Sequence, residues 1–271
     1  MKNLEHQQRA PLRILSPEEP DSSATGKCAL AIMTKAPRPG VVKTRLSPPL
    51  TPEEASNLNR CFLRDTAAAI SKAGENTQGI ACYTPVGAKD IYRDLLPPEF
   101  RLIAQRGEHL SERLINATAD LFAAGFAAVC LINSDSPTIP ASAFAQAAAI
   151  LSRPQAAVVI GPADDGGYYL IGVNRLHPQI FEGIAWSTSV VLEQTHARAA
   201  ELGVAVDLLP RGYDVDDPAS LRRLCCELLD PNESEKENGA RATQQFLCEI
   251  IAREGRARLC PDRETGTFRA H

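Results

Sequence analysis

The sequence lacks the long apolar segments that mark membrane and secreted proteins. Its longest apolar stretch, Phe122–Ile132, is far shorter than the roughly 20 residues that a spanning helix needs. The first 26 residues are polar and contain no apolar core of the kind that signal peptides carry. We therefore expect a cytoplasmic protein without a membrane span.

Paired metal-binding cysteines are also absent. The chain has eight cysteines, but none of them forms a C-x-x-C pair, so the usual spacing of a zinc site is missing. A chain of 271 residues can bury a core without a disulfide framework. Several cysteines lie in apolar runs, as Cys130 does, and we expect structural or incidental thiols rather than a redox or metal centre.

An excess of basic residues is the third absence. The net charge is -4 and the pI is about 5.8, whereas proteins that bind nucleic acid usually carry a basic surplus. We therefore predict no nucleic-acid partner. A small cationic pocket for a phosphorylated ligand remains compatible with this balance, because it needs only a few charged groups.

Strands and helices alternate along most of the chain, which predicts a single α/β domain over residues 27–229 with a doubly wound, mainly parallel sheet. The flanking residues are expected to form a disordered arm, a linker, a last helix and a flexible tail, over 1–26, 230–241, 242–253 and 254–271. The expected strands are 28–33, 79–83, 101–105, 127–132, 156–160, 168–173 and 204–208. The expected helices begin at Thr51 or cover 89–96, 110–124, 141–151, 189–202 and 217–229.

A cationic loop follows the first predicted strand. Ligands of open α/β sheets bind outside the carboxyl ends of the strands, so Lys35, Lys43 and Arg45 could converge there on phosphate oxygens. Gly40 allows backbone conformations that other residues avoid, and Thr44 lies between the two later cations. The loop is not a P-loop, because the glycine that precedes the lysine is missing. The alternative is a solvated basic turn.

Aspartates follow two other strands. Asp135 comes directly after the apolar strand 127–132, where a carboxylate is costly without a partner, and Mg²⁺ or Mn²⁺ bound to phosphates would be a suitable one. Alternatively, Asp135 caps the next helix. Near Pro218, Asp217 is a good helix cap, which leaves Asp214 and Asp216 without a capping role. Asp216 is thus a candidate second metal ligand, or else part of a solvated acidic loop.

The segment Asp164-Asp165-Gly166-Gly167 predicts a tight turn. Such a turn could leave backbone N–H groups free for a ligand, with Asp165 facing a sugar or an acceptor. Asp-Gly is equally typical of an ordinary hairpin, and both interpretations stay open. Trp186, the only tryptophan, could stack on a sugar or a base, or could pack in the core.

These motifs, in this order, resemble the bacterial transferases encoded beside radical-SAM/selenodomain and arsenosugar-biosynthesis proteins, which are usually called glycosyltransferases. The resemblance covers about residues 27–250. The motifs that carry it are Lys35-x-Pro37-x-x-Gly40-x-x-Lys43-Thr44-Arg45-Leu46, Ser134-Asp135-Ser136-Pro137, Gly161-Pro162-x-x-Asp165-Gly166-Gly167-Tyr168, Trp186-Ser187-Thr188 and Asp214-Val215-Asp216. In the segment Gly107–Arg113, Ser111 replaces the second glycine that is usual in the family.

The resemblance implies the GT-A fold of nucleotide-diphospho-sugar transferases. It implies a nucleotide over the first loop, Arg113 among the nucleotide-binding residues, and a divalent metal on an acid at the position of Asp135. Our leading hypothesis is a metal-dependent glycosyltransferase that uses a nucleotide sugar and a small-molecule acceptor, with Asp135 and Asp165 as the catalytic acids. The alternatives are a nucleotidyltransferase that releases pyrophosphate and a non-catalytic nucleotide-binding protein. No residue is identified as the catalytic base.

Overall fold

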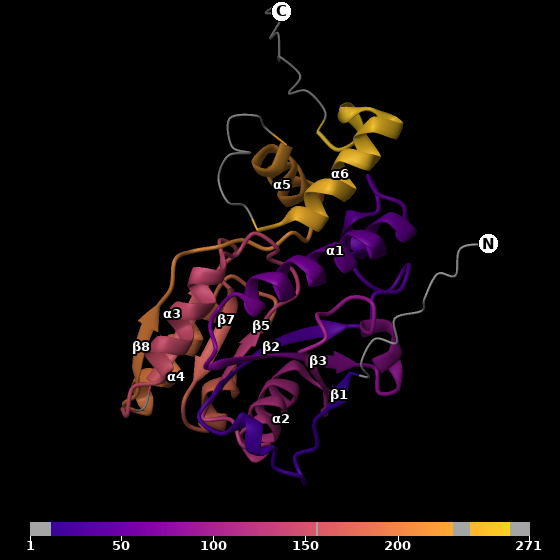
Figure 1. Ribbon diagram of the computed structural model, residues 1–271. Helices are drawn as coiled ribbons and strands as arrows, with labels where there is room; N and C mark the ends of the chain where they lie inside the picture. The colour runs from indigo at the N-terminus through magenta and orange to yellow at the C-terminus, as the bar shows by residue number, and fades with distance from the viewer. Residues whose placement is uncertain (1–11, 156, 230–238, 261–271) are drawn as a thin grey trace, which may run out of the picture.

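The computed structural model describes residues 12–155, 157–229 and 239–260, and it is built on one eight-stranded sheet with the order β1-β4-β3-β2-β5-β7-β6-β8 (Figure 1). The strands are β1 (Arg13–Ile14), β2 (Cys28–Lys35), β3 (Thr77–Thr84), β4 (Arg101–Ala104), β5 (Ala128–Ile132), β6 (Ala157–Pro162), β7 (Tyr168–Val173) and β8 (Ala205–Leu208). The helices of the described residues are α1 (Pro52–Ser71), α2 (Leu110–Ala123), α3 (Ala141–Leu151), α4 (Val191–Glu201), α5 (Pro218–Leu229) and α6 (Arg241–Glu254).

The sheet is mainly parallel, which confirms the predicted fold class. Strand β7 is the exception, because it runs antiparallel to both β5 and β6. The central strands β2 and β5 are continuous apolar runs that are buried almost throughout, as strands covered on both faces should be. Their carboxyl ends, and those of β6 and β8, place the following loops at one edge of the sheet.

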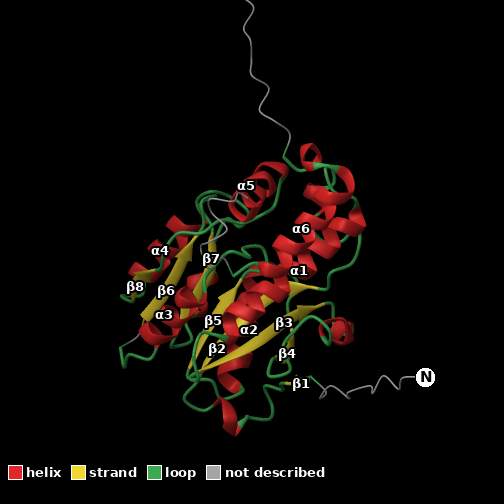
Figure 2. Cartoon of the chain, turned by 45° about the horizontal axis from the view of Figure 1, so that its top comes forward, coloured by secondary structure: helices red, strands yellow, loops and turns green. Residues whose placement is uncertain are grey.

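Helices cover both faces of the sheet (Figure 2). On one face, α1 and α3 pack on alternate residues of β2, including Leu30 and Ile32. On the other face, residues of α2 and α4 pack with Ala29 and Ala31 from the same strand. The period of two in side-chain direction along a strand divides these contacts between the two layers. The arrangement explains why β2 shows no polar alternation in the sequence.

A third apolar cluster joins α5 and α6 to the N-terminal half of α1, which contributes Ala55, Leu58 and Phe62. The capping box at the start of α1 is present, since Thr51 and Glu54 each accept a hydrogen bond from the other's backbone N–H. Farther along α1, the buried Asp65 accepts hydrogen bonds from the backbone N–H groups of Ala242 and Thr243, at 2.9 and 2.8 Å. Asp65 thus caps α6 from another helix, which fixes the C-terminal part of the chain against α1.

The N-terminal arm differs from its prediction. Residues 1–11 lie outside the described residues, but residues 12–26 are not a disordered arm: β1 pairs in parallel with β4, and Ser22–Ala24 form a short 3-10 helix. The physical reason is a buried ion pair between Asp21 and Arg101, the first residue of β4. Composition could not reveal this partner, which lies 80 residues away.

The C-terminal predictions fall partly outside the described residues. The linker predicted over 230–241 lies outside them except for its last residues, and so does the tail after residue 260. Residues 254–260 are not a flexible tail, because Arg258 pairs with Glu54 and Leu259 is buried. The helix predicted over 89–96 is a shorter 3-10 helix, Ala88–Tyr92. Within the described residues, no helix combines the length and apolarity that a membrane span requires.

Candidate functional site

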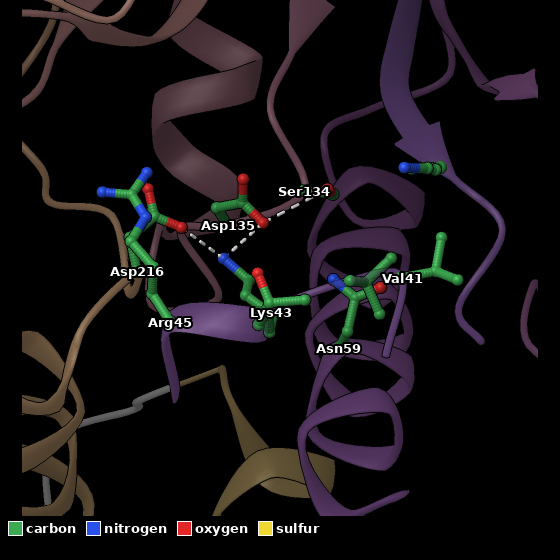
Figure 3. A pocket seen from close by; sticks show the side chains of 10 residues that line it. Val41, Lys43, Arg45, Asn59, Ser134, Asp135 and Asp216 are labelled. Carbon is green, nitrogen blue, oxygen red and sulfur yellow. Dashed lines mark hydrogen bonds and ion pairs between the residues drawn. The ribbon is translucent and has the colours of Figure 1, made fainter. Parts of the chain in front are cut away.

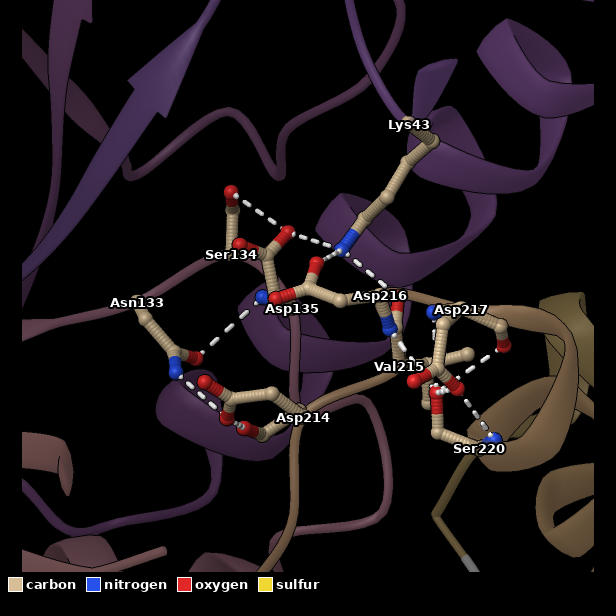
Figure 4. Close-up of polar contacts among 10 residues, drawn as sticks. Lys43, Asn133, Ser134, Asp135, Asp214, Val215, Asp216, Asp217 and Ser220 are labelled. Carbon is tan, nitrogen blue, oxygen red and sulfur yellow. Dashed lines mark hydrogen bonds and ion pairs between the residues drawn. The ribbon is translucent and has the colours of Figure 1, made fainter. Parts of the chain in front are cut away.

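Lys43 lies at the centre of the carboxyl edge of the sheet. Its side chain is only 4% exposed, and its Nζ donates to Asp135 Oδ1 at 2.5 Å, to Asp216 Oδ1 at 2.9 Å and to the Val215 carbonyl oxygen at 2.8 Å (Figure 4). Burial alone would lower the pKa of Lys43, but the two carboxylates outweigh it and raise the pKa. The ammonium is therefore charged and holds three segments together.

Asp135 and Asp216 are thus brought to one point, as the sequence predicted, although they follow different strands. Their side chains remain 32% and 41% exposed, so both carboxylates still face open space. The Lys43 ammonium bridges these two acids, and Lys43 also lines the cavity beside them. Its contact with phosphate stays a prediction. Its backbone is left-handed, with φ of 50°, and the sequence could not reveal that two carboxylates lie beside its ammonium.

A cavity of about 220 Å³ opens beside this cluster (Figure 3). Lys35, Thr44 and Arg45 line it, whereas Gly40 does not. The left-handed φ of 71° at Gly40 serves the turn that leads into this wall. Asn59 of α1 also lines the cavity; it is buried, and its Oδ1 accepts no hydrogen bond in the described part of the chain. Sequence patterning missed Asn59, because a polar residue on a helix gives no signal of its own.

A second group of hydrogen bonds holds the Asp135 loop against the segment Asp214-Val215. Asp214 accepts hydrogen bonds from Ser136 Oγ at 2.5 Å and from Asn133 Nδ2 at 2.8 Å, while the Val215 N–H donates to the Asp135 carbonyl at 2.9 Å. Burial, reinforced by the negative charges of Asp135 and Asp165, raises the pKa of Asp214 to about 6. The sequence singled out Asp214 as lacking a capping role and as part of the Asp214-Val215-Asp216 motif. In the structure its hydrogen bonds position the neighbouring loop.

The turn between β6 and β7 lines a larger adjoining cavity of about 850 Å³, together with Asp135 and Asp216. Asp165 points its Oδ1 at the N–H of Gly167, 2.9 Å away, and the Gly166 N–H donates to the Ala163 carbonyl at 3.3 Å. These backbone N–H groups are therefore not free for a ligand, contrary to prediction. The hairpin interpretation explains them better, and the Asp165 carboxylate is what remains for chemistry.

Arg113 differs from its expected role, and Ser111 makes a contact that the sequence did not indicate. The Arg113 guanidinium donates to the carbonyl oxygens of Gly107 and Glu108 and lines neither cavity, so its observed role is to close its own loop. Ser111, which stands where glycine is usual, accepts a hydrogen bond from the Trp186 indole at 2.7 Å. Trp186 lines the larger cavity, and its ring meets that of Tyr168 edge to face, 6.3 Å between centroids.

Backbone strain also concentrates at these cavities. Across the described ranges, the non-glycine residues with positive φ are Lys43 at 50° and Ser187 at 63°, and each lines a cavity. Such conformations cost about 1–3 kcal/mol and persist where the surroundings enforce them. They are frequent in binding and active sites.

The residues at this edge suit a hard divalent cation. Asp135 and Asp216 supply two carboxylates, and Mg²⁺ commonly binds one or two carboxylates while phosphates and water complete its shell. A site held entirely by protein groups is not seen, because the described residues contain no group of three or more His, Cys, Asp or Glu that could hold an ion. The donor set thus fits a metal that arrives with a phosphorylated ligand.

Comparison with solved structures connects this architecture to known proteins. A candidate nucleotide-diphospho-sugar transferase from Desulfovibrio desulfuricans G20 is 29% identical, with a TM-score of 0.73, over 83% of this chain and 95% of that one. The fold is that of nucleotide-diphospho-sugar transferases. A family model described as "uncharacterized protein conserved in bacteria (DUF2064)" matches residues 67–188. The comparison with curated proteins found no match.

The comparison with solved structures also found more distant matches. The 4-diphosphocytidyl-2C-methyl-D-erythritol synthase of Anaerococcus prevotii is 11% identical over 72% of this chain and 92% of its own, with a TM-score of 0.46. A manganese complex of Rv0371c from Mycobacterium tuberculosis H37Rv is 16% identical over 74% and 98%, with a TM-score of 0.42. At these values, neither bears on the chemistry of this protein.

Proposed function

We propose that the protein is a metal-dependent transferase of the glycosyltransferase type, which uses a nucleotide-sugar donor and a small-molecule acceptor. The observation that carries this proposal is the meeting of Lys43, Asp135 and Asp216 beside two cavities, both of which Asp135 and Asp216 line. The smaller cavity, with Lys35, Thr44 and Arg45, suits a diphosphate. The larger one, with Asp165, has room for a sugar and an acceptor. The motif resemblance to the radical-SAM-associated transferases supports the same assignment.

Each residue has a defined part in this proposal. Asp135 and Asp216 would hold the divalent cation, which neutralises charge that develops on the leaving diphosphate. Arg45 would bind phosphate oxygens with its planar fork. Lys43 keeps the two carboxylates together before ligand arrives, so that they need not repel each other. Asp165 would accept hydrogen bonds from hydroxyl groups of the sugar or the acceptor.

The reaction class is tested by its products. The purified protein is screened by thermal shift against nucleotides and nucleotide sugars with Mg²⁺ or Mn²⁺, and saturating ligand should add about 2.7 kcal/mol at 100 times its Kd. Turnover of the stabilising nucleotide sugar should release a nucleoside diphosphate or monophosphate without pyrophosphate. Metal-dependent pyrophosphate release from a nucleoside triphosphate as the main activity would overturn this proposal in favour of a nucleotidyltransferase.

A matched pair of variants tests the diphosphate site. Arg45 lines the smaller cavity, whereas Arg38 is an exposed arginine of the same loop that lines neither cavity. Arg45→Ala should weaken nucleotide binding by about 1.5–3 kcal/mol, the range for hydrogen bonds to charged groups. Arg38→Ala should leave it unchanged. Equal affinities in the two variants would exclude this wall as the phosphate site.

A further inference from the structure

The larger cavity is lined by side chains of two kinds. Its apolar wall includes Met33, Leu110, Leu114, Leu131, Ile171 and Trp186. Its aspartate rim consists of the aspartates that follow β6 and β8. A ligand that fills this cavity therefore meets both apolar surface and carboxylates.

Trp186 is held in a fixed orientation on the apolar wall. Its indole N–H donates to Ser111 Oγ at 2.7 Å, and its ring stands at 83° to that of Tyr168. The side chain is only partly buried, so indole surface remains available within the cavity. A rigid aromatic surface suits the apolar face of a sugar ring or of an aryl group, and its low mobility limits the entropy lost on binding.

The aspartate rim makes the lining acidic. Away from the Lys43 cluster, Asp164, Asp165, Asp214 and Asp217 line the cavity. Two arginines line it as well. Arg45 acts electrostatically on Asp217, and Arg223 places its Nη1 2.6 Å from Asp164 Oδ2 and its guanidinium 3.7 Å from the Tyr213 ring centroid. Because these aspartates outnumber the arginines, the rim offers acceptors for hydroxyl or ammonium groups and disfavours a phosphate placed among them.

We infer that the acceptor is an uncharged or cationic hydroxylated molecule with an apolar face, which stacks on Trp186 and directs its polar groups at the aspartate rim. Phosphorylated acceptors should bind more weakly, because the aspartates of the cavity lining outnumber its arginines. The assignment of this ligand as the acceptor rests on the proposed function. The preference of the cavity for uncharged or cationic ligands rests on its lining residues alone, and it can be measured without a donor.

Trp186 provides the measurement, because it is the only tryptophan of the chain and lies in the cavity wall. The full-length protein is titrated with phenyl β-glucoside, its 6-amino-6-deoxy derivative and its 6-phosphate, while tryptophan emission is followed. The neutral and amino probes should change the emission saturably. The dissociation constant of the 6-phosphate should be at least about tenfold higher than that of the neutral probe.

Two variants test whether the rim causes the discrimination. Asp164→Asn removes one carboxylate and releases Arg223. The ratio of the dissociation constants of the 6-phosphate and the neutral probe should therefore fall severalfold. Asp90→Asn is the control, because Asp90 is exposed and lies in neither cavity; it should change nothing. The inference is overturned if the 6-phosphate binds as well as the neutral probe, if none of the probes changes the emission, or if both variants behave alike.

The titration is independent of the turnover assay. Probe binding with the expected preference, but without nucleoside diphosphate release from any nucleotide sugar, would overturn the proposed reaction and keep the cavity assignment. Nucleoside diphosphate release with a phosphorylated acceptor would support the proposed reaction and overturn the cavity assignment.

Discussion

Among the charged clusters of the described residues, two lie at opposite ends of the sheet and differ in how completely they are enclosed. At the amino end, Asp21 and Arg101 bury each other, with side chains 6% and 9% exposed. At the carboxyl end, Lys43 is 4% exposed, but its partners Asp135 and Asp216 are 32% and 41% exposed. Both clusters join segments that are distant in sequence.

The difference separates a structural cluster from a functional one. Around Asp21, Ser23 supplies two more hydrogen bonds, so this cluster has nothing left to offer a ligand. Asp135 and Asp216 keep oxygen atoms that face two cavities. In the Asp21 cluster both charged groups are buried, and the cluster serves the fold. In the Lys43 cluster only the ammonium is buried, so the carboxylates of Asp135 and Asp216 can still bind a second cation.

Removal of the enclosed carboxylate should have the largest effect on stability. Asp21→Ala leaves Arg101 buried without its partner, which typically costs about 3–5 kcal/mol. Urea denaturation should show the loss, while nucleotide affinity of the folded fraction should stay the same. Asp90→Ala, which breaks an exposed pair with Arg93, is the control and should cost at most about 1 kcal/mol. If Asp21→Ala lowers the free energy of unfolding by no more than the control does, the Asp21 cluster does not stabilise the fold as we infer.

Replacement of the bridging cation should have the next largest effect. Lys43→Met keeps the volume and removes the ammonium, so we expect a loss of about 1.5–3 kcal/mol in metal-free buffer. Because Lys43 and a metal would compete for the same carboxylates, Mg²⁺ should stabilise the variant more than the parent. The added stability should be about 1.4 kcal/mol at ten times the Kd. Equal Mg²⁺ responses of the two proteins would argue against a shared site.

A single carboxylate of the open cluster should matter less for folding than for ligand binding. Asp135→Asn should cost about 0.5–1 kcal/mol, because its side chain is partly solvated and Asp216 still pairs with Lys43. The variant should lose the Mg²⁺-dependent thermal shift by nucleotide. Asp207→Asn is the control, because Asp207 is similarly exposed, at 37%, and also pairs with a cation, Arg153; it should keep that shift. Retention of the shift in both variants would remove Asp135 from the metal site.

Acid should weaken the enclosed cluster gradually. Burial opposes ionisation of Asp21, but hydrogen bonds from Ser23 and the charges of Arg101 and Arg13 outweigh it and lower its pKa below the ordinary value of 3.8. A lowered pKa in the folded state gives stability that is present above pH 3.8 and is lost as the pH falls through the folded-state value. The slope of unfolding free energy against pH in this range should be smaller in Asp21→Asn than in the parent.

The sequence predicted the elements of the fold well, because they depend on local patterns. Apolar runs identified β2 and β5, and the capping residues identified α1. The Asp135 and Asp216 encounter was also predictable, since both follow strands that end at one edge. The partners of Lys43 and Asp21 were not predictable, because each ion pair joins residues that only the folded sheet brings together. The same holds for the Ser111–Trp186 hydrogen bond, which depends on the packing of two loops.

Gly166 has a consequence for how this site can change. A Cβ atom at Gly166 would lie 2.0 Å from the Ser189 carbonyl oxygen, and the Gly166 carbonyl accepts the N–H of Leu192 in α4 at 2.9 Å. The turn that carries Asp165 is therefore docked without clearance on the segment that follows Trp186. A homologue could not exchange one of these loops alone: the two would have to be inherited, or grafted, as a single module.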